Sequence, residues 1–147
     1  MKLLVLNGPN LNMLGIREPQ IYGAQTYRDL EAFIQGICDA EGIDVRIAQT
    51  NHEGELVDLI QSAYQDVDGI VINPAAYTHT SVAILDAVKA VALPTVEVHL
   101  SDVSKRESFR RISYVREACC ATFAGYGFDG YRLAILHLKK LFEQDGE

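Results

Sequence analysis

Short apolar runs alternate along the chain with longer stretches in which apolar residues recur at helical spacing. Residues 2–6 form a continuous apolar run, as expected of a strand that is buried on both faces. The same reasoning predicts further strands over residues 44–49, 69–72, 95–99 and 119–124. Helical spacing predicts helices from about residue 27 to 42, over residues 55–64, from residue 78 to about 92, and over about residues 131–143.

Residue types at the ends of these segments support the division. Thr26 is suited to cap the first helix, because its hydroxyl can accept a backbone N–H, and Gly42 is suited to end that helix. Thr78 has the same capping chemistry ahead of the third helix, and Pro94 opens the fourth strand. The closing helix is expected to bury one apolar face that includes Leu136.

Five strands that alternate with helices imply a parallel sheet covered on both faces, with right-handed crossovers. For a chain of 147 residues we expect one α/β domain over residues 1–147, a flavodoxin-like three-layer sandwich of strand order 2-1-3-4-5. In that order the first, third and fourth strands are neighbours. Ligands of such folds bind at the carboxyl ends of the strands, near the reversal of strand order.

Polar side chains follow these three strands. Asn10 comes after the first strand, Asn73 and His79 come after the third, and residues 97–101 (Glu-Val-His-Leu-Ser) end the fourth. Ordinary turn chemistry explains Asn-Gly-Pro or Asn-Pro taken singly. It explains three converging segments less well, so the pattern favours a functional crevice.

Residues 8–25 form the longest stretch without clear periodicity. A structureless loop beyond ~12–15 residues in a compact domain is usually functional or disordered. This stretch carries Arg17 and Tyr22, and it also carries apolar residues such as Leu11 and Leu14 that a disordered surface loop would lack. We therefore expect a lid that closes over the crevice.

Composition narrows the class of ligand. A net charge of -7 argues against nonspecific binding to nucleic acid, which depends on an excess of Lys and Arg. The basic residues are nevertheless concentrated in one segment, which contains Lys105, Arg106, Arg110, Arg111 and Arg116. A local cluster of this kind is compatible with an anionic small substrate.

Two further features bear on location and on metals. No run approaches the ~18–20 apolar residues of a membrane span, and the short apolar start is broken at once by Asn-Gly-Pro, so we expect a cytoplasmic protein that does not bind membranes. The cysteines, Cys38, Cys119 and Cys120, lack metal-ligand spacing, and the adjacent pair is expected to be buried and reduced. We expect no metal and no cofactor.

Four blocks of sequence together resemble one enzyme family. Residues 7–23 read NGPNLNMLGIREPQIYG, residues 73–81 read NPAAYTHTS, residues 97–101 read EVHLS, and Arg106-Glu107 is followed by Phe109-Arg110. In order and spacing these blocks resemble type II 3-dehydroquinate dehydratase over essentially the whole chain. The resemblance implies a flavodoxin-like fold and reversible dehydration of 3-dehydroquinate to 3-dehydroshikimate, without a cofactor or a Schiff base.

The resemblance also implies residue roles in proton transfer. Tyr22 would remove the proton at C2 of the substrate, helped by Arg17 on the same loop. Asn10 would hold a water that stabilises the enolate oxygen. His99 would protonate the leaving C1 hydroxyl, and Glu97 would orient His99.

The remaining roles concern binding and assembly. The substrate carboxylate would be bound by Asn73, Ser101 and the backbone N–H of Leu100, and the ring hydroxyls by His79 and Arg110. Family members form trimers that pack into dodecamers, in which Asp86 would reach the site of a neighbouring subunit. The same chemistry serves aromatic amino-acid biosynthesis and quinate breakdown.

Elementary chemistry is compatible with these roles. A free tyrosine has a pKa of about 10, so lowering it by two to three units requires roughly 2.7–4 kcal/mol of preferential phenolate stabilisation, which a nearby guanidinium can supply. Glu97, His99 and Ser101 alternate along one strand end and therefore share a face. A glutamate at that spacing can orient the imidazole and favour its protonated form, as a general acid requires.

Four positions depart from the family pattern. Ala75 stands where the family usually has Gly, Leu85 where Arg is common next to Asp86, Asp102 in place of the usual Asn, and Arg111 in place of a common His. None of them removes a residue implied in proton transfer. Leu85 changes the surroundings of Asp86 and so bears on subunit packing.

A flavodoxin-like module that binds a small ligand without catalysis is the alternative interpretation. A flavin or phosphate site would favour a Ser/Thr/Gly-rich loop after the first strand, where this chain has Asn-Gly-Pro-Asn. A phosphate-receiver domain would place an Asp where Asn73 stands. A Schiff-base dehydratase would need a buried lysine at the crevice, and none of the five lysines is expected there.

Overall fold

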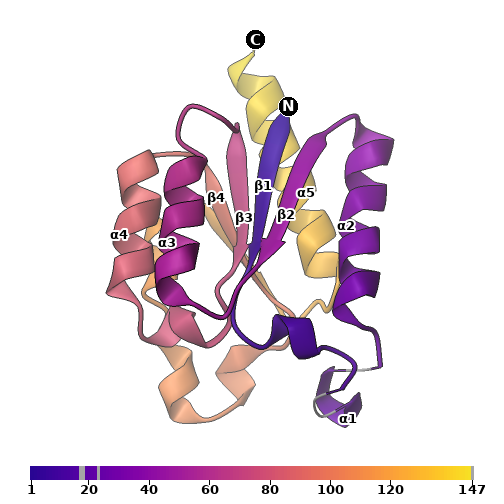
Figure 1. Cartoon of the computed structure of the whole chain (residues 1–147), viewed down its shortest axis with the longest axis vertical. Helices are drawn as coiled ribbons and strands as arrows, with labels where there is room; N and C mark the ends of the chain where they lie inside the picture. The colour runs from indigo at the N-terminus through magenta and orange to yellow at the C-terminus, as the bar shows by residue number, and fades with distance from the viewer. Residues whose placement is uncertain (17–18, 23, 147) are drawn as a thin grey trace.

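The computed structural model describes residues 1–16, 19–22 and 24–146, and for residues 21 and 22 it describes the backbone alone. Five strands form one sheet: β1 (Lys2–Asn7), β2 (Asp44–Gln49), β3 (Gly69–Asn73), β4 (Thr95–His99) and β5 (Ala121–Ala124). All neighbouring strands are parallel and their order is β2-β1-β3-β4-β5, which confirms the predicted topology (Figure 1).

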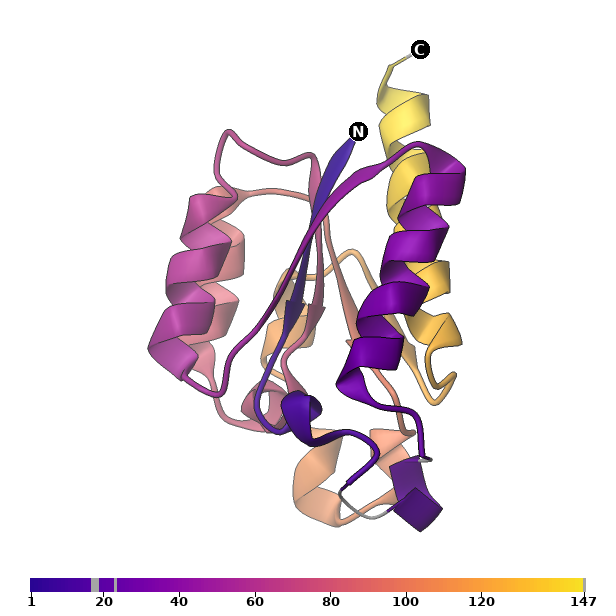
Figure 2. The ribbon, with the colours of Figure 1, turned by 45° about the vertical axis from the view of Figure 1, so that its right-hand side comes forward.

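Four helices cover the sheet in two layers. One face is covered by α2 (Tyr27–Glu41) and α5 (Asp129–Asp145), and the other by α3 (Glu53–Ser62) and α4 (Val82–Val91), as Figure 2 shows. Each interface has its own hydrophobic core, because the central strands β1 and β3 are buried on both faces. This is the three-layer α/β sandwich expected from the sequence.

The helix ends show one correct and one wrong capping prediction. Thr26 caps α2 in a reciprocal capping box with Asp29, and Gly42 ends this helix in the left-handed conformation at φ 68°. Thr78 does not cap α4. The hydroxyl of Ser81 does so instead by accepting the N–H of Ile84, because residues 75–79 form a separate 3-10 turn before the helix.

Two burial predictions are also wrong. Leu136 lies on the outer side of α5 and is 38% exposed, whereas Tyr131, in the first turn of α5, is fully buried. Of the adjacent pair, Cys120 is exposed and Cys119 is only partly buried, because both precede β5 instead of lying within a buried strand; Cys38 is buried as a free thiol.

Most of the short helical turns in the described part of the chain lie at the carboxyl ends of the strands. The short turns are η1 (Leu11–Met13), α1 (Pro19–Tyr22), η2 (Ala75–His79), η3 (Val103–Lys105), η4 (Ser108–Arg111) and η5 (Val115–Ala118). Most of them gather at the lower edge of the sheet in Figure 1, while both termini lie at the opposite edge. Among the described helices none is long and apolar enough to cross a membrane.

The segment expected to form a lid is partly anchored. Leu11 and Leu14 are buried in the core on the α2 side of the sheet. Gly15 has φ 83°, and a Cβ added there would lie 2.9 Å from the carbonyl oxygen of Ala24. The backbones at Gly15 and Ala24 therefore meet, which fixes the two ends of the intervening stretch.

Candidate active site

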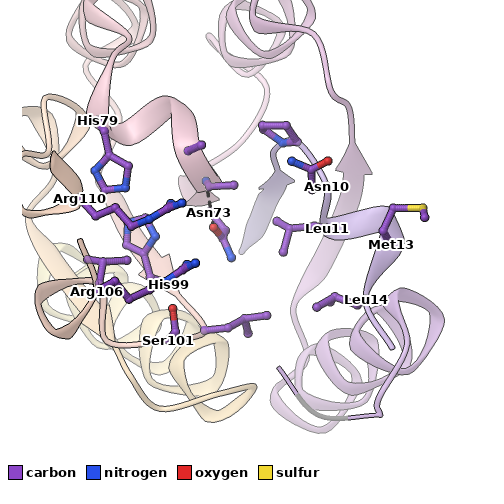
Figure 3. A pocket seen from close by; sticks show the side chains of 15 residues that line it. Asn10, Leu11, Met13, Leu14, Asn73, His79, His99, Ser101, Arg106 and Arg110 are labelled. Atoms are coloured by element: carbon purple, nitrogen blue, oxygen red, sulfur yellow. Dashed lines mark hydrogen bonds between the residues drawn. The ribbon is translucent and has the colours of Figure 1, made fainter. Parts of the chain in front are cut away.

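A pocket of about 240 Å³ lies at the carboxyl ends of β1, β3 and β4 (Figure 3). Its lining comes from the segments that follow these strands, and consists of Pro9, Asn10, Leu11, Met13, Leu14, Asn73, Ala75, Ala76, His79, His99, Leu100, Ser101, Val103, Arg106 and Arg110. None of these described lining residues is acidic, although the chain as a whole carries a charge of -7. The pocket is suited to a small anionic or hydroxylated ligand.

The loop after β1 holds Asn10 at the mouth of the pocket. Asn10 adopts φ 72°, a left-handed conformation that asparagine tolerates better than most residues, and its backbone N–H donates to Oδ1 of Asn51 at 3.0 Å. The Gly8 N–H donates to the carbonyl of Asn73 at 2.8 Å, and a Cβ at Gly8 would lie 2.7 Å from the carbonyl oxygen of Pro74. The loops after β1 and β3 are therefore in backbone contact.

Asn73 forms part of a buried neutral network at the end of β3. Its Oδ1 accepts the N–H of Ala75 at 3.1 Å, and its Nδ2 donates to the Tyr131 hydroxyl at 2.9 Å. That hydroxyl donates in turn to Oδ1 of Asn7 at 2.6 Å; Asn7 is the register partner of Asn73. Burial raises the pKa of Tyr131 well above its ordinary range, so this network is uncharged. The second Nδ2 proton of Asn73 remains for a ligand.

Glu97 and His99, at the end of β4, form a buried pair. His99 Nε2 lies 2.5 Å from Oε2 of Glu97, and Glu97 also accepts the Thr78 hydroxyl at 2.5 Å. Burial alone would raise the pKa of Glu97, but the hydrogen bond and charge of His99, the Thr78 hydroxyl and the Arg116 guanidinium hold the pKa of this carboxyl below its usual value. The Glu97 carboxylate is therefore ionised, and Nδ1 is the ring nitrogen of His99 that remains for a ligand.

His79 projects into the pocket from η2. Its Nδ1 lies 2.7 Å from the backbone carbonyl of Ile112, and because a carbonyl only accepts, Nδ1 carries the proton of this hydrogen bond. The opposite nitrogen, Nε2, is then available to a bound molecule. The tautomer of His79 is thus fixed by the chain segment that follows η4.

Two arginines form the basic wall of the pocket. Arg110 donates through Nε to Oε2 of Glu107 at 2.6 Å, which holds its guanidinium in place. The family resemblance implies Arg110 as a ligand contact and gives no such role to Arg106 or Arg111. Both Arg110 and Arg106 line the pocket, whereas Arg111 is exposed and lies outside it, so the structure adds Arg106 to the pocket residues.

The other residues named from the sequence fall into three groups. Leu100 and Ser101 line the pocket directly after β4. Asp86 is exposed on α4 and is absent from the lining of its own chain's pocket. Arg17 and the side chain of Tyr22 lie outside the described residues, although the backbone of Tyr22 ends α1 near the same edge of the sheet.

Sequence reasoning missed three supporting groups, of which Thr78 and Tyr131 are fully buried and Ser113 is partly buried. Thr78 was assigned to a helix cap, Ser113 has no sequence signal, and Tyr131 reads only as the start of an amphipathic helix. Each of them contacts a polar side chain far away in the sequence, so only the fold reveals its partner. Among the described residues no group of three His, Cys, Asp or Glu side chains could hold a metal ion.

Comparison with known proteins gives one consistent result. The family model described as dehydroquinase class II matches residues 1–139. The 3-dehydroquinate dehydratase of Clostridium acetobutylicum is 51% identical over 144 residues, which cover 98% of this chain and 100% of the relative. The 3-dehydroquinate dehydratase 2 of Pseudomonas putida is 51% identical over 142 residues, covering 97% of this chain and 95% of the relative.

Solved structures agree with the family match. The type II dehydroquinase of Butyrivibrio crossotus superposes with a TM-score of 0.93 at 50% identity, covering 95% of this chain and 97% of that one. The type II dehydroquinase of Propionibacterium acnes gives a TM-score of 0.88 at 44% identity, covering 95% and 94%. These matches favour an enzyme over a binding module without catalysis. The chain belongs to the class II dehydroquinase family and is a lyase that dehydrates 3-dehydroquinate.

Proposed function

We propose that the pocket binds 3-dehydroquinate with its carboxylate at Asn73, Ser101 and the backbone N–H of Leu100. The observation that carries this proposal is the buried hydrogen bond between Glu97 and His99, whose ring lines a pocket with no acidic side chain among its described lining residues. A buried ion pair at the end of a strand needs a reason beyond stability, because isosteric apolar packing would serve stability as well. Proton transfer supplies such a reason.

The reaction proceeds in two proton steps in this proposal. Tyr22, as a phenolate stabilised by Arg17, takes the proton from C2, and the electron pair forms an enolate with the neighbouring ketone. A water held by Asn10 stabilises the enolate oxygen. The enolate then collapses to the C1–C2 double bond as the C1–oxygen bond breaks, and His99 gives its proton to the leaving hydroxyl, so that water departs.

The other pocket residues bind the ring. His79, with its proton fixed on Nδ1, accepts a ring hydroxyl through Nε2, and Arg110 donates to another hydroxyl or to the carboxylate. Arg106 lies on the same pocket wall as Arg110, which supports a contribution of Arg106 to binding the substrate carboxylate.

The wider organisation belongs to the same proposal. We place the moving part of the lid after Gly15, because Leu11 and Leu14 are packed in the core. The exposed position of Asp86 on α4 is compatible with its reaching a neighbouring subunit in a trimer of a dodecamer. We also expect one domain over residues 1–147, in the cytoplasm.

The test is a continuous assay of purified protein with 3-dehydroquinate, recorded as the rise in enone absorbance. We expect turnover in the wild type, a loss of at least about 100-fold in kcat for His99→Gln and Tyr22→Phe, and wild-type rates for His52→Gln, an exposed histidine outside the pocket. Full activity in His99→Gln would refute its role as the acid. A lysine adduct trapped by borohydride during turnover would refute the tyrosine-base mechanism.

A further inference from the structure

Two hydroxyl groups lie directly behind the Glu97–His99 pair. The Thr78 Oγ1 is 2.5 Å from Oε2 of Glu97, and the Ser113 Oγ is 2.7 Å from Thr78 Oγ1 and 3.2 Å from Oε1 of Glu97. Thr78 and Glu97 are fully buried. Residue 78 is in η2 and residue 113 lies between η4 and η5, so two separate segments converge on one carboxylate.

Counting protons gives the direction of these hydrogen bonds. Each hydroxyl has one proton, and an ionised carboxylate only accepts. If Ser113 and Thr78 both donated to Glu97, two hydroxyl oxygens would lie 2.7 Å apart with no proton between them. The arrangement without this conflict is a series: the Arg116 N–H donates to Ser113 at 3.1 Å, Ser113 donates to Thr78, and Thr78 donates to Glu97. Hydrogen bonds in series polarise and strengthen one another.

The ionisable groups around Glu97 are compatible with a negatively charged Glu97 carboxylate, which accepts the last hydrogen bond of this series. His99 lies beside it on β4, and Arg116 on η5 adds a positive field. Cys119, directly after η5, has its pKa raised to about 12 by burial and by the charge of Glu97, so the thiol stays neutral. Arg106 and Arg110 line the same pocket as His99.

The same series is tied to the ligand-binding wall. The Tyr114 N–H donates to the carbonyl of Thr78 at 2.8 Å, and the Ile112 carbonyl accepts Nδ1 of His79. Residues 112–114 are therefore joined to η2 on both sides of Ser113. A shift of Ser113 would disturb His79 and Glu97 together.

We propose that Thr78 and Ser113 are positioning residues for the reaction, whose hydroxyls in series keep Glu97 ionised and oriented so that His99 keeps one ring nitrogen on the carboxylate and presents the other to the substrate. This inference rests on the proposed function and deepens it. Neither hydroxyl touches the substrate. Both act through Glu97.

The kinetic test compares Thr78→Val and Ser113→Ala with Thr78→Ser, which keeps the hydroxyl, and with Thr80→Val, an exposed neighbour on the same segment. We expect kcat to fall about 10- to 100-fold in Thr78→Val, the range that loss of one hydrogen bond to a charged group gives, and less in Ser113→Ala. KM should stay within about twofold. The acidic limb of the pH–rate profile should move to higher pH, because a carboxylate without its donor is protonated more easily.

Retained kcat in Thr78→Val, or an unmoved acidic limb, would overturn the inference. So would a loss in Thr78→Ser equal to that in Thr78→Val, because a packing role alone does not depend on the hydroxyl. If Thr78→Val does not fold, Ser113→Ala carries the same comparison, since its hydroxyl is the next in the series.

A measurement without substrate separates this inference from the proposed function. The ¹⁵N chemical shifts of the His99 ring report which nitrogen bears the proton. We expect one defined state in the wild type and in Thr80→Val, and a changed or averaged signal in Thr78→Val. Unchanged His99 signals in Thr78→Val would overturn the hydroxyl series. A wild type that is inactive with 3-dehydroquinate would instead overturn the proposed function.

Discussion

Two polar clusters, buried except for the partly exposed Ser113, lie beneath the pocket, and they differ in charge. The neutral cluster consists of Asn7, Asn73 and Tyr131, and the charged cluster of Thr78, Glu97, His99 and Ser113. Each cluster ends in a side chain that lines the pocket, which is an amide in the first case and an imidazole in the second. Both clusters are hydrogen-bonded internally. A comparison of the two therefore shows what a buried charge contributes.

The neutral cluster holds neighbouring elements of the fold in a fixed arrangement. Its hydrogen bonds join β1, β3 and the first turn of α5, and each is worth about 1 kcal/mol net. The charged cluster fixes a protonation state, because the ionised Glu97 is stabilised by its donors and by the charge of its partner. Under the proposed function, burial at this edge of the sheet therefore serves geometry in the neutral cluster and proton transfer in the charged one.

The largest expected effect breaks the charged cluster. Glu97→Gln replaces the carboxylate by a neutral amide of similar size, so His99 loses its charged hydrogen-bond partner, and we expect kcat to fall about 100-fold or more. KM should change little, because Glu97 does not line the pocket. Steady-state kinetics with Glu117→Gln, an exposed glutamate on η5, as the control checks this. Near wild-type kcat in Glu97→Gln would remove the contrast in function between the two clusters.

The second effect breaks the neutral cluster. Tyr131→Phe leaves an amide proton of Asn73 and the Oδ1 of Asn7 without their partner, which should lower the free energy of unfolding by about 1–3 kcal/mol. Because Asn73 then loses its fixed orientation, KM should rise several-fold more than kcat falls. Urea unfolding and steady-state kinetics measure both quantities. The exposed Tyr64→Phe is the control, and equal losses in the two variants would contradict the prediction.

The third effect sharpens the comparison through pH. The pKa of Glu97 is lowered in the folded protein, so its stabilisation is present above the unfolded value of about 4.3 and is lost as the pH falls below it. The pKa of Tyr131 is raised, so its stabilisation is present below about 10 and is lost as the pH rises. A single titrating group changes the slope of the free energy of unfolding against pH by at most about 1.4 kcal/mol per pH unit.

Urea unfolding measured at a series of pH values tests these opposite pH dependences. In a plot of the free energy of unfolding against pH, Glu97→Gln should flatten only the acidic side, and Tyr131→Phe should flatten only the alkaline side. A variant that flattened the opposite side, or both sides equally, would show that the two clusters do not titrate as separate units.

The smallest effect concerns Ala75, whose N–H anchors Asn73 although its φ of 51° suits glycine. Ala75→Gly should raise the free energy of unfolding by about 0.5–1 kcal/mol, because a left-handed alanine costs more than the added freedom of glycine in the unfolded chain. Ala92→Gly, at φ 56° at the end of α4, is the matched control and should give a similar gain far from the pocket. Failure of both to stabilise would contradict the strain argument.

The sequence predicted the sheet and the strand-end residues for a clear physical reason. Buried parallel strands require continuous apolar runs, so order and layers follow from the alternation of patterns. Asn73 and His99 then stand at carboxyl ends that must converge. The function was predicted from the resemblance to one enzyme family, and the match to the model of that family confirms the resemblance.

The supporting groups could not be predicted in this way. Thr78 and Ser81 have the same capping chemistry, and only the 3-10 turn over η2 decides which one caps α4. The partner of Tyr131 lies 58 residues away and that of Ser113 lies 35 residues away, at separations that no local pattern specifies. The departure at Ala75 was visible in the sequence, but its positive φ was not.

The absence of acidic lining residues in the described pocket has a consequence at long range. From a distance, an anionic molecule meets a protein of charge -7, and it meets the arginine wall only within a few ångströms of the pocket. At physiological ionic strength the screening length is about 8 Å, so salt suppresses the distant repulsion before it weakens the local attraction. At physiological ionic strength, capture of an anion by this molecule is therefore governed by the last few ångströms of approach.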